Sequence, residues 1–144
     1  MDETDYMILK LMRENARIPL SHISKEIGLS SPSIRDRIDK MENEGIILGY
    51  RPILDHKKLG LSITAFANVR LRYPNCCTDE FIEGIKEINE VVEGHYTDGE
   101  DDMLLKIVAS DTGHLRDVLL RLNSMNSVTN SKSIISLSTP IRER

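Results

Sequence analysis

The 144-residue sequence predicts an α+β fold in two parts, a helical N-terminal part and a C-terminal part that mixes strands with helices. Before about residue 47, apolar residues recur at intervals of three and four, the period of a helix that buries one face. After Leu59 and Gly60 the interval changes to two, as in a half-buried strand. Hydrophobic residues make up 40 % and charged residues 29 % of the chain, a composition typical of a globular protein.

Three short helices are predicted in the N-terminal part, because three apolar stripes follow one another there. The stripes consist of Ile8, Leu11 and Met12, of Leu20, Ile23 and Ile27, and of Ile34, Ile38 and Met41. Gly28 is typical of a helix C-cap. Ser30-Ser31-Pro32 then supplies a serine N-cap and a proline for the first turn of the third helix, which we expect to end at Gly45.

A short strand or hairpin is predicted after the third helix, over Ile46–Leu54. Three short helices with a tight glycine turn between the last two, followed by a β element, form the pattern of a winged helix-turn-helix. Each helix is too short to be stable alone in water, so the three stripes must share one core. We therefore expect a winged helix-turn-helix domain over residues 1–49 and a linker over residues 50–60.

Residues 61–144 are predicted to form a ferredoxin-like β-α-β-β-α-β domain. Apolar and polar residues alternate from Leu61 to Arg72, which predicts a strand that ends at Pro74. Further strands are predicted over residues 91–97, 103–109 and 128–139, with a turn over residues 98–101. Two helices are expected, with apolar faces formed by Phe81, Ile85 and Ile88 and by Leu115, Val118, Leu119 and Leu122.

Five of the six residues from Met103 to Val108 are apolar, which indicates that both faces of this strand are buried. A ferredoxin-like sheet carries its helices on one face only, so the other face needs a different partner. Ile134, Ile135 and Leu137 repeat the apolar pattern in the last strand. We expect the open face to pack against a second copy of the chain, which predicts a homodimer.

The third helix is the candidate element for contact with nucleic acid. On a helical wheel Ser33, Arg37 and Lys40 share one flank beside the apolar stripe, and Arg35 lies on the other flank. Hydroxyl and guanidinium groups in the first turns of such a helix can meet phosphates and base edges in the major groove. We expect Ser31, Ser33, Arg35, Arg37 and Lys40 to contact double-stranded DNA.

The alternative for this helix is a solvated face held by ion pairs at i and i+4, namely Arg35 with Asp39 and Asp36 with Lys40. The charge distribution favours contact with DNA by the N-terminal part. Residues 1–60 hold ten Lys or Arg and ten Asp or Glu, whereas residues 61–144 hold nine and thirteen, so the net charge of −4 lies entirely in the C-terminal part. DNA would repel an acidic C-terminal part but not a neutral N-terminal one.

The N-terminal part contains the stretches Asp5–Leu9, Asn15–Arg17, Ile27–Ser30, Arg37-Ile38, Met41–Ile47 and Leu59-Gly60. These stretches resemble the DNA-binding half of the Lrp/AsnC family of regulators. In the C-terminal part Gly99–Leu105 is similar to the family's Gly-x-x-Asp-Tyr-Leu-Leu stretch, with Met103 in place of the tyrosine. The resemblance covers nearly the whole chain, in the expected order.

This resemblance implies a transcription regulator that binds palindromic DNA as a homodimer, often assembled further into a tetramer or octamer. It also implies a small effector, commonly an amino acid, bound between the second domains with Gly99 and Asp102 at the site. Glycine lets backbone amides approach an effector carboxylate, and an aspartate accepts hydrogen bonds from an α-ammonium group. The alternative for these two residues is a plain hairpin turn.

Two other functions stay open at the level of the sequence. An architectural protein that wraps DNA without an effector needs the same third helix and the same dimer. Sirohaem decarboxylases are relatives of this architecture that keep a degraded helix-turn-helix and use histidine and arginine around a tetrapyrrole. The intact Leu29–Ser33 stretch favours the regulator.

We expect no catalytic residue, cofactor or metal site. No second histidine or cysteine lies at i+3 to i+5 from any of the four histidines, which are His22, His56, His95 and His114. The adjacent Cys76 and Cys77 cannot complete a structural zinc site and are typical of free thiols in a reducing compartment. No apolar run approaches the roughly 20 residues of a membrane helix. The acidic N-terminus lacks the layout of a signal peptide, so we expect a cytoplasmic protein.

Overall fold

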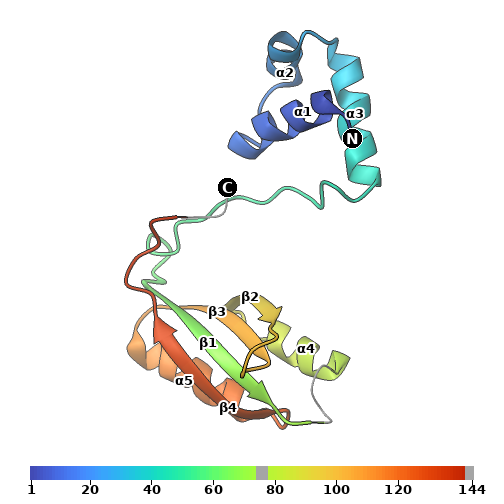
Figure 1. Ribbon diagram of the computed structural model, residues 1–144. Helices are drawn as coiled ribbons and strands as arrows, with labels where there is room; N and C mark the ends of the chain where they lie inside the picture. The colour runs from blue at the N-terminus through green and yellow to red at the C-terminus, as the bar shows by residue number, and fades with distance from the viewer. Residues whose placement is uncertain (74–77, 142–144) are drawn as a thin grey trace. The chain divides into compact units, whose positions relative to one another are not determined.

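The computed structural model describes residues 1–73 and 78–141. The predicted strand end at Pro74 and the pair Cys76 and Cys77 lie outside the described residues. The chain forms two compact units, one built chiefly from Met1–Ile53 and the other from Leu54–Pro140. The first unit is helical, and the second contains a four-stranded sheet with helices packed against it (Figure 1).

The three predicted N-terminal helices are confirmed as α1 (Glu3–Glu14), α2 (Leu20–Ile27) and α3 (Ser31–Asn43). Their apolar stripes meet in one small core of five buried residues, Ile8, Ile23, Ile34, Ile38 and Met41. The other members of the predicted stripes are partly buried around this core. Because each helix has a single apolar face, the opposite side of every helix stays in solvent.

Local capping residues fix where these helices begin and end. Gly28 closes α2 in the left-handed conformation, with a φ of 79°, which glycine adopts without a steric penalty. The hydroxyl of Ser30 accepts the amide hydrogen of Ser33 at the start of α3, and Pro32 occupies the first turn. The sequence predicted both caps.

The strand or hairpin predicted over Ile46–Leu54 is wrong, since no strand occurs among the described residues of the helical unit. The amides of Ile46 and Ile47 donate to the carbonyl of Met41, which continues the end of α3 as turns. Leu48 beyond them is 94 % exposed. Strand backbone needs a neighbouring strand for its hydrogen bonds, and this unit supplies none.

The C-terminal unit has the predicted β-α-β-β-α-β order. Its elements are β1 (Ile63–Leu71), α4 (Asp79–Lys86), β2 (Val91–Tyr96), β3 (Met103–Ala109), α5 (Thr112–Asn123) and β4 (Val128–Ile135). The sheet order is β2-β3-β1-β4, every neighbouring pair is antiparallel, and both helices lie on the same face (Figure 1). The last strand ends at Ile135, before the predicted residue 139, and the amide of Ser136 still donates to the carbonyl of Thr64 near the start of β1.

The helix-covered face of the sheet holds the larger core. In β1 the buried residues are every second one, Ala65, Ala67, Val69 and Leu71, and they pack against apolar residues of α4 and α5. On the open face of β3, Val108 is buried whereas Leu104 is half-buried. In the single chain, burial on the open face of β3 therefore includes Val108 but is incomplete at Leu104, where a second copy of the chain is expected to pack.

Removing a large side chain from this core should destabilise the C-terminal unit. Leu105 is fully buried in β3, so Leu105→Ala should lower the free energy of unfolding by about 2–5 kcal/mol through lost apolar contact and a residual cavity. The matched control is Leu120→Ala on α5, where the leucine is 61 % exposed and the change should stay within about 0.5 kcal/mol. Urea unfolding followed by circular dichroism measures both, and equal losses would contradict the core assignment.

Candidate nucleic-acid interface and ligand site

Four of the five residues predicted to contact DNA present their side chains on the solvent side of α3. Ser33, Arg35 and Lys40 are exposed and Ser31 is half-buried at the start of the helix. Lys40 lies 3.8 Å from Glu44 with its side chain 68 % exposed, so this ion pair is weak and the ammonium group stays accessible. Within the described residues, neither of the two pairs considered for a merely solvated helix, Arg35 with Asp39 and Asp36 with Lys40, is formed.

Arg37 is the exception, because its guanidinium is already occupied within the helical unit. Its Nη1 atom lies 2.7 Å from Oδ2 of Asp2 and 2.7 Å from Oδ1 of Asp5, both at the start of α1. The sequence prediction that Arg37 contacts DNA missed these partners. The available signal was its position three residues after Ile34, which places it about 60° from the buried stripe and so toward a neighbouring helix.

The same contacts shift the acid-base properties of the start of α1. The hydrogen bond from Arg37 is the largest cause that lowers the pKa of Asp2 below its ordinary value of 3.8. The pKa of Asp5 is lowered first by its backbone hydrogen bond with Asp2 and then by Arg37. Among the described residues, Asp5 is the one charged residue that is buried. Both carboxylates are thus held ionised at neutral pH.

A second contact joins α3 to the residues that follow it. The Tyr50 hydroxyl donates to Oε1 of Glu42 at 2.6 Å, and Tyr50 borders a shallow hollow between the three helices. Partial burial and the Glu42 carboxylate raise the pKa of Tyr50 to about 12. The sequence placed Tyr50 at the start of the linker and gave no sign of this bond.

The predicted effector residues share one exposed turn between β2 and β3. Oδ2 of Asp102 accepts the amide hydrogen of Leu71 at 2.7 Å, and the Asp102 amide donates to the Val69 carbonyl at 3.0 Å. Asp102 therefore fastens the turn to the end of β1. Gly99 is exposed, and no atom outside its chain neighbours lies within 4 Å of the place that a Cβ would take.

Arg70 of β1 also holds this turn, and the sequence did not single it out. Its Nη2 atom donates to the Glu100 carbonyl at 2.9 Å and lies 3.4 Å from Oδ1 of Asp101. Arg70 belongs to the open face of the sheet, since it alternates with the buried Val69 and Leu71. The turn between β2 and β3 therefore combines acidic side chains with one arginine from the neighbouring strand β1.

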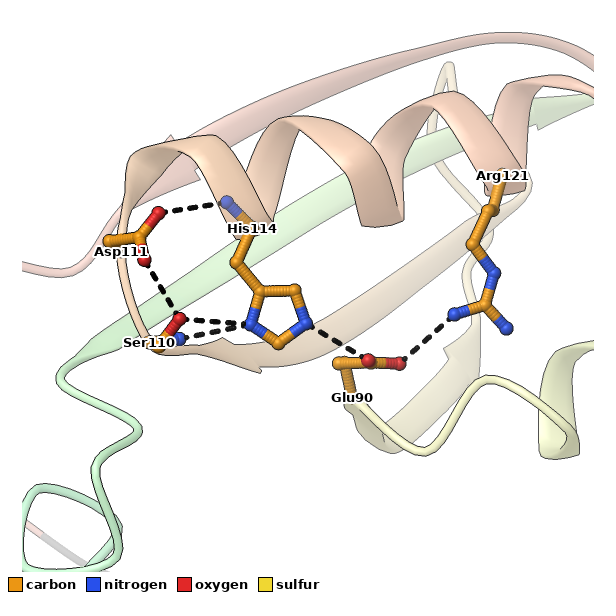
Figure 2. Close-up of polar contacts among 5 residues, drawn as sticks. All are labelled: Glu90, Ser110, Asp111, His114 and Arg121. Carbon is orange, nitrogen blue, oxygen red and sulfur yellow. Dashed lines mark hydrogen bonds and ion pairs between the residues drawn. The ribbon is translucent and has the colours of Figure 1, made fainter.

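A third polar cluster surrounds His114 near the start of α5 (Figure 2). Nε2 of His114 lies 3.0 Å from Oε1 of Glu90, and Arg121 lies 3.5 Å from the other Glu90 oxygen. The Nδ1 atom of His114 accepts the backbone amide hydrogen of Ser110, and the Ser110 hydroxyl lies 3.2 Å from the same Nδ1 atom and donates to Asp111 at 2.9 Å. The hydrogen bond between His114 and Glu90 is the largest cause that lowers the pKa of Glu90, and the charge of Arg121 lowers it further.

The composition of this cluster, serine, histidine and carboxylate, is that of an acyl-transfer triad, but its hydrogen bonds differ. A general base needs a free ring nitrogen to take the serine proton. Here Nδ1 already accepts a backbone amide hydrogen, and the Ser110 hydroxyl lies closer to Oδ2 of Asp111, at 2.9 Å, than to Nδ1, at 3.2 Å. The cluster instead ties the residue before β2 to the first turn and the last turn of α5.

Throughout residues 1–73 and 78–141, no group of three or more His, Cys, Asp or Glu side chains is arranged to hold a metal ion. His95 pairs with Glu93 at 2.8 Å on the sheet surface, as expected for an exposed strand histidine. In the same ranges, no helix is long and apolar enough to cross a membrane.

Comparison with known protein families gives two matches that together cover almost the whole chain. Residues 64–144 match the family model described as the Lrp/AsnC ligand binding domain. Residues 1–47 match the model described as winged helix-turn-helix DNA-binding.

Individual relatives align along nearly their full length. The chain is 30 % identical over 142 residues to the regulatory protein AsnC of Haemophilus influenzae, covering 98 % of this chain and 94 % of that protein. It is 35 % identical over 137 residues to a proline dehydrogenase transcriptional activator of Rhizobium radiobacter, covering 94 % and 88 %. A transcriptional regulator of Neisseria meningitidis in complex with L-Met is similar in structure, with a TM-score of 0.93, 26 % identity and coverage of 99 % and 93 %. AsnC of E. coli gives a TM-score of 0.85 at 26 % identity, with coverage of 100 % and 97 %.

Low pH should lower the free energy of unfolding of the helical unit, because it protonates Asp2 and Asp5. Because the folded state lowers both carboxyl pKa values below 3.8, the ionised groups contribute stability that is present above about pH 4 and lost as pH falls through the lowered values. Arg37→Met removes part of this contribution. The difference in unfolding free energy between wild type and variant should therefore shrink between about pH 6 and about pH 3.

Denaturant unfolding at each pH, followed by circular dichroism, measures this difference. Arg35→Met is the matched control, since Arg35 lies on the same helix and is exposed. Its difference from wild type should not change with pH. If the difference in unfolding free energy between wild type and Arg37→Met does not change with pH, the ion pairs contribute nothing measurable to stability.

Proposed function

The chain belongs to the Lrp/AsnC family of DNA-binding transcriptional regulators, and from this premise we propose which of its residues bind DNA and which bind an effector. In this proposal α3 enters the major groove of double-stranded DNA with its exposed side. A small amino-acid-like effector binds at the turn between β2 and β3 and changes the affinity for DNA. The observation that carries the proposal is the accessible polar side of α3, which stands opposite a complete apolar stripe.

The proposed DNA contacts come from Ser31, Ser33, Arg35 and Lys40, whereas Arg37 of the same helix is paired with Asp2 and Asp5. Ser31 and Ser33 lie in the first turn of α3, where hydroxyls reach phosphates or base edges. Arg35 and Lys40 lie on opposite flanks, so the two cations can meet phosphates on both sides of the groove. Phosphate contacts would fix the register of the helix, and base contacts would select the sequence.

The effector proposal rests on Gly99 and Asp102. The match of residues 64–144 to a ligand-binding domain supports a small ligand in this unit, and the L-Met bound to a similar structure supports an amino acid as its class. One Asp102 oxygen is taken by the Leu71 amide, which leaves the other to accept bonds from an α-ammonium group. The backbone at Gly99 would receive the effector carboxylate.

We also propose that the chain works as a homodimer, joined through the open face of the sheet and assembled further into tetramers or octamers. Phe66 of β1 and Ile134 of β4 are direct neighbours on this face, and Ile134 is 66 % exposed in the single chain. Burial of such a pair against a second copy would remove apolar surface from water. Dimerisation would also pair two α3 helices, as a palindromic DNA site requires.

The second candidate function is an architectural protein that wraps DNA without an effector. The bonds of Asp102 to the end of β1 favour it, because they give the turn a structural purpose that needs no ligand. Titration calorimetry over a panel of the common amino acids separates the two. Binding of one amino acid supports the effector-gated regulator, and no binding of any supports the architectural protein. An absorption band after incubation with sirohaem would instead support the enzymatic alternative.

Loss of one proposed phosphate contact should change the salt dependence of DNA binding. With a DNA fragment from the region upstream of its own gene, Lys40→Ala should bind more weakly and lower the slope of log affinity against log salt concentration by about 1. Lys86→Ala on α4 is the matched control, since its ammonium is similarly exposed but lies in the other unit. Mobility-shift titrations between about 50 and 200 mM salt provide the slopes. Equal slopes for all three proteins would remove Lys40 from the interface.

The effector response should depend on Asp102. Asp102→Asn keeps an oxygen for the Leu71 amide but loses the charge that would meet an α-ammonium group. The variant should therefore bind DNA like wild type and fail to respond to pooled amino acids in the same mobility shift. Asp98→Asn, a charge loss at an exposed position of the same turn, should keep the response. A normal response by Asp102→Asn would leave the turn a structural element only.

A further inference from the structure

We propose that Arg37 is a positioning residue for DNA binding, which fixes the orientation of α3 through the first turn of α1 and does not itself contact DNA. This inference rests on the proposed function, in which the exposed side of α3 docks on DNA. It concerns a different role from that of Arg35 and Lys40, whose charges face solvent.

The first turn of α1 is built to receive one guanidinium group. Oδ1 of Asp2 accepts the Asp5 amide at 2.9 Å, and Oδ2 of Asp5 accepts the Asp2 amide at 2.8 Å, which forms a capping box. The remaining oxygen of each carboxylate lies 2.7 Å from the same Nη1 atom of Arg37. All four carboxylate oxygens are therefore in use, two for the helix start and two for Arg37.

Arg37 is held more firmly than a surface cation. Two carboxylates bind it, Asp5 is buried, and the capping box fixes the positions of both acids. To reach a DNA phosphate, Arg37 would give up two negative partners for one. It would also leave Asp2 and Asp5 unpaired beside a polyanion, where their charges would be repelled. The ion pairs are therefore retained when DNA binds.

These bonds orient α3 in a way that its apolar contacts do not. The core contacts of Ile34, Ile38 and Met41 are non-directional, so they hold the helix against its neighbours but tolerate small rolls about its axis. Charge-assisted hydrogen bonds have defined distances and directions. Arg37 lies between the buried stripe and the flank of Ser33 and Lys40. Its attachment to α1 therefore sets the direction in which that flank points.

Replacing an aspartate by asparagine distinguishes positioning from direct contact, because the two roles predict opposite changes in the affinity for DNA. Asp5→Asn removes a negative charge and, if Arg37 contacts phosphate, frees Arg37 and strengthens binding to DNA. If Arg37 positions α3, Asp5→Asn weakens binding to the upstream fragment by about tenfold, within the range measured for coupled side chains. Glu3→Gln is the matched control, because it removes an exposed acid from the same first turn and should not weaken binding.

Salt dependence separates a positioning role from direct contact with phosphate, because only a lost phosphate contact lowers the slope. Arg37→Met should weaken binding by about tenfold while the slope of log affinity against log salt stays that of wild type, unlike the slope of Lys40→Ala. The double variant with Asp5→Asn should bind no more weakly than Arg37→Met alone, since both disrupt one interaction. Each variant is first checked for native far-ultraviolet circular dichroism at the assay temperature. Asp2→Asn, which leaves the Asp5 contact, replaces any variant that fails to fold.

The outcomes separate this inference from the proposed function. Weaker binding by Asp5→Asn or Asp2→Asn, with an unchanged salt slope for Arg37→Met, supports the positioning role. Stronger binding by the aspartate variants, or a slope lowered by about 1 in Arg37→Met, overturns it and returns Arg37 to the DNA contacts. If wild type itself does not shift the DNA, the proposed function fails and this inference fails with it.

Discussion

The constraint on which this structure depends is that each helix has only one apolar face to bury, and that the helices of the C-terminal unit cover only one face of its sheet. In the helical unit, Ile8, Ile23 and Ile34 use those faces against one another, so the opposite side of α3 is left for other contacts. In the C-terminal unit α4 and α5 cover one side of the sheet and leave the other open (Figure 1). The proposed DNA-binding surface and the proposed dimer surface are both what remains after this burial.

Two polar networks fix the orientation of helices whose apolar core contacts are non-directional. At the start of α1, two aspartates form a capping box and bind one arginine of α3. At the start of α5, His114 links a backbone amide to Glu90, which also pairs with Arg121 (Figure 2). Both networks join a helix terminus to an element distant in sequence. Charged and histidine side chains that suggest catalysis or DNA contact thus have structural tasks in this chain.

The two units differ in net charge, and this difference suits the separate roles proposed for them. The helical unit is near neutral, so its few accessible cations would act at particular positions and not as a general attraction to polyanions. The acidic C-terminal unit would be kept away from DNA, which leaves it free for self-association and for a ligand. A turn that combines Arg70 with acidic neighbours fits a ligand that carries both charges, as a free amino acid does.

The sequence by itself determined the type and order of the helices and of the strands of the sheet, because the apolar period, the Ser30 N-cap and the Gly28 C-cap act within a few residues. It also identified Ser33, Arg35 and Lys40 as solvent-facing, since that follows from their positions relative to Ile34 and Ile38. Only the tertiary structure decided the roles of Arg37, Arg70 and Asp102, whose partners lie about thirty residues away in the chain. It also decided against a strand over Ile46–Leu54. A strand depends on a partner that local sequence does not encode, and the helical unit of a single chain offers none.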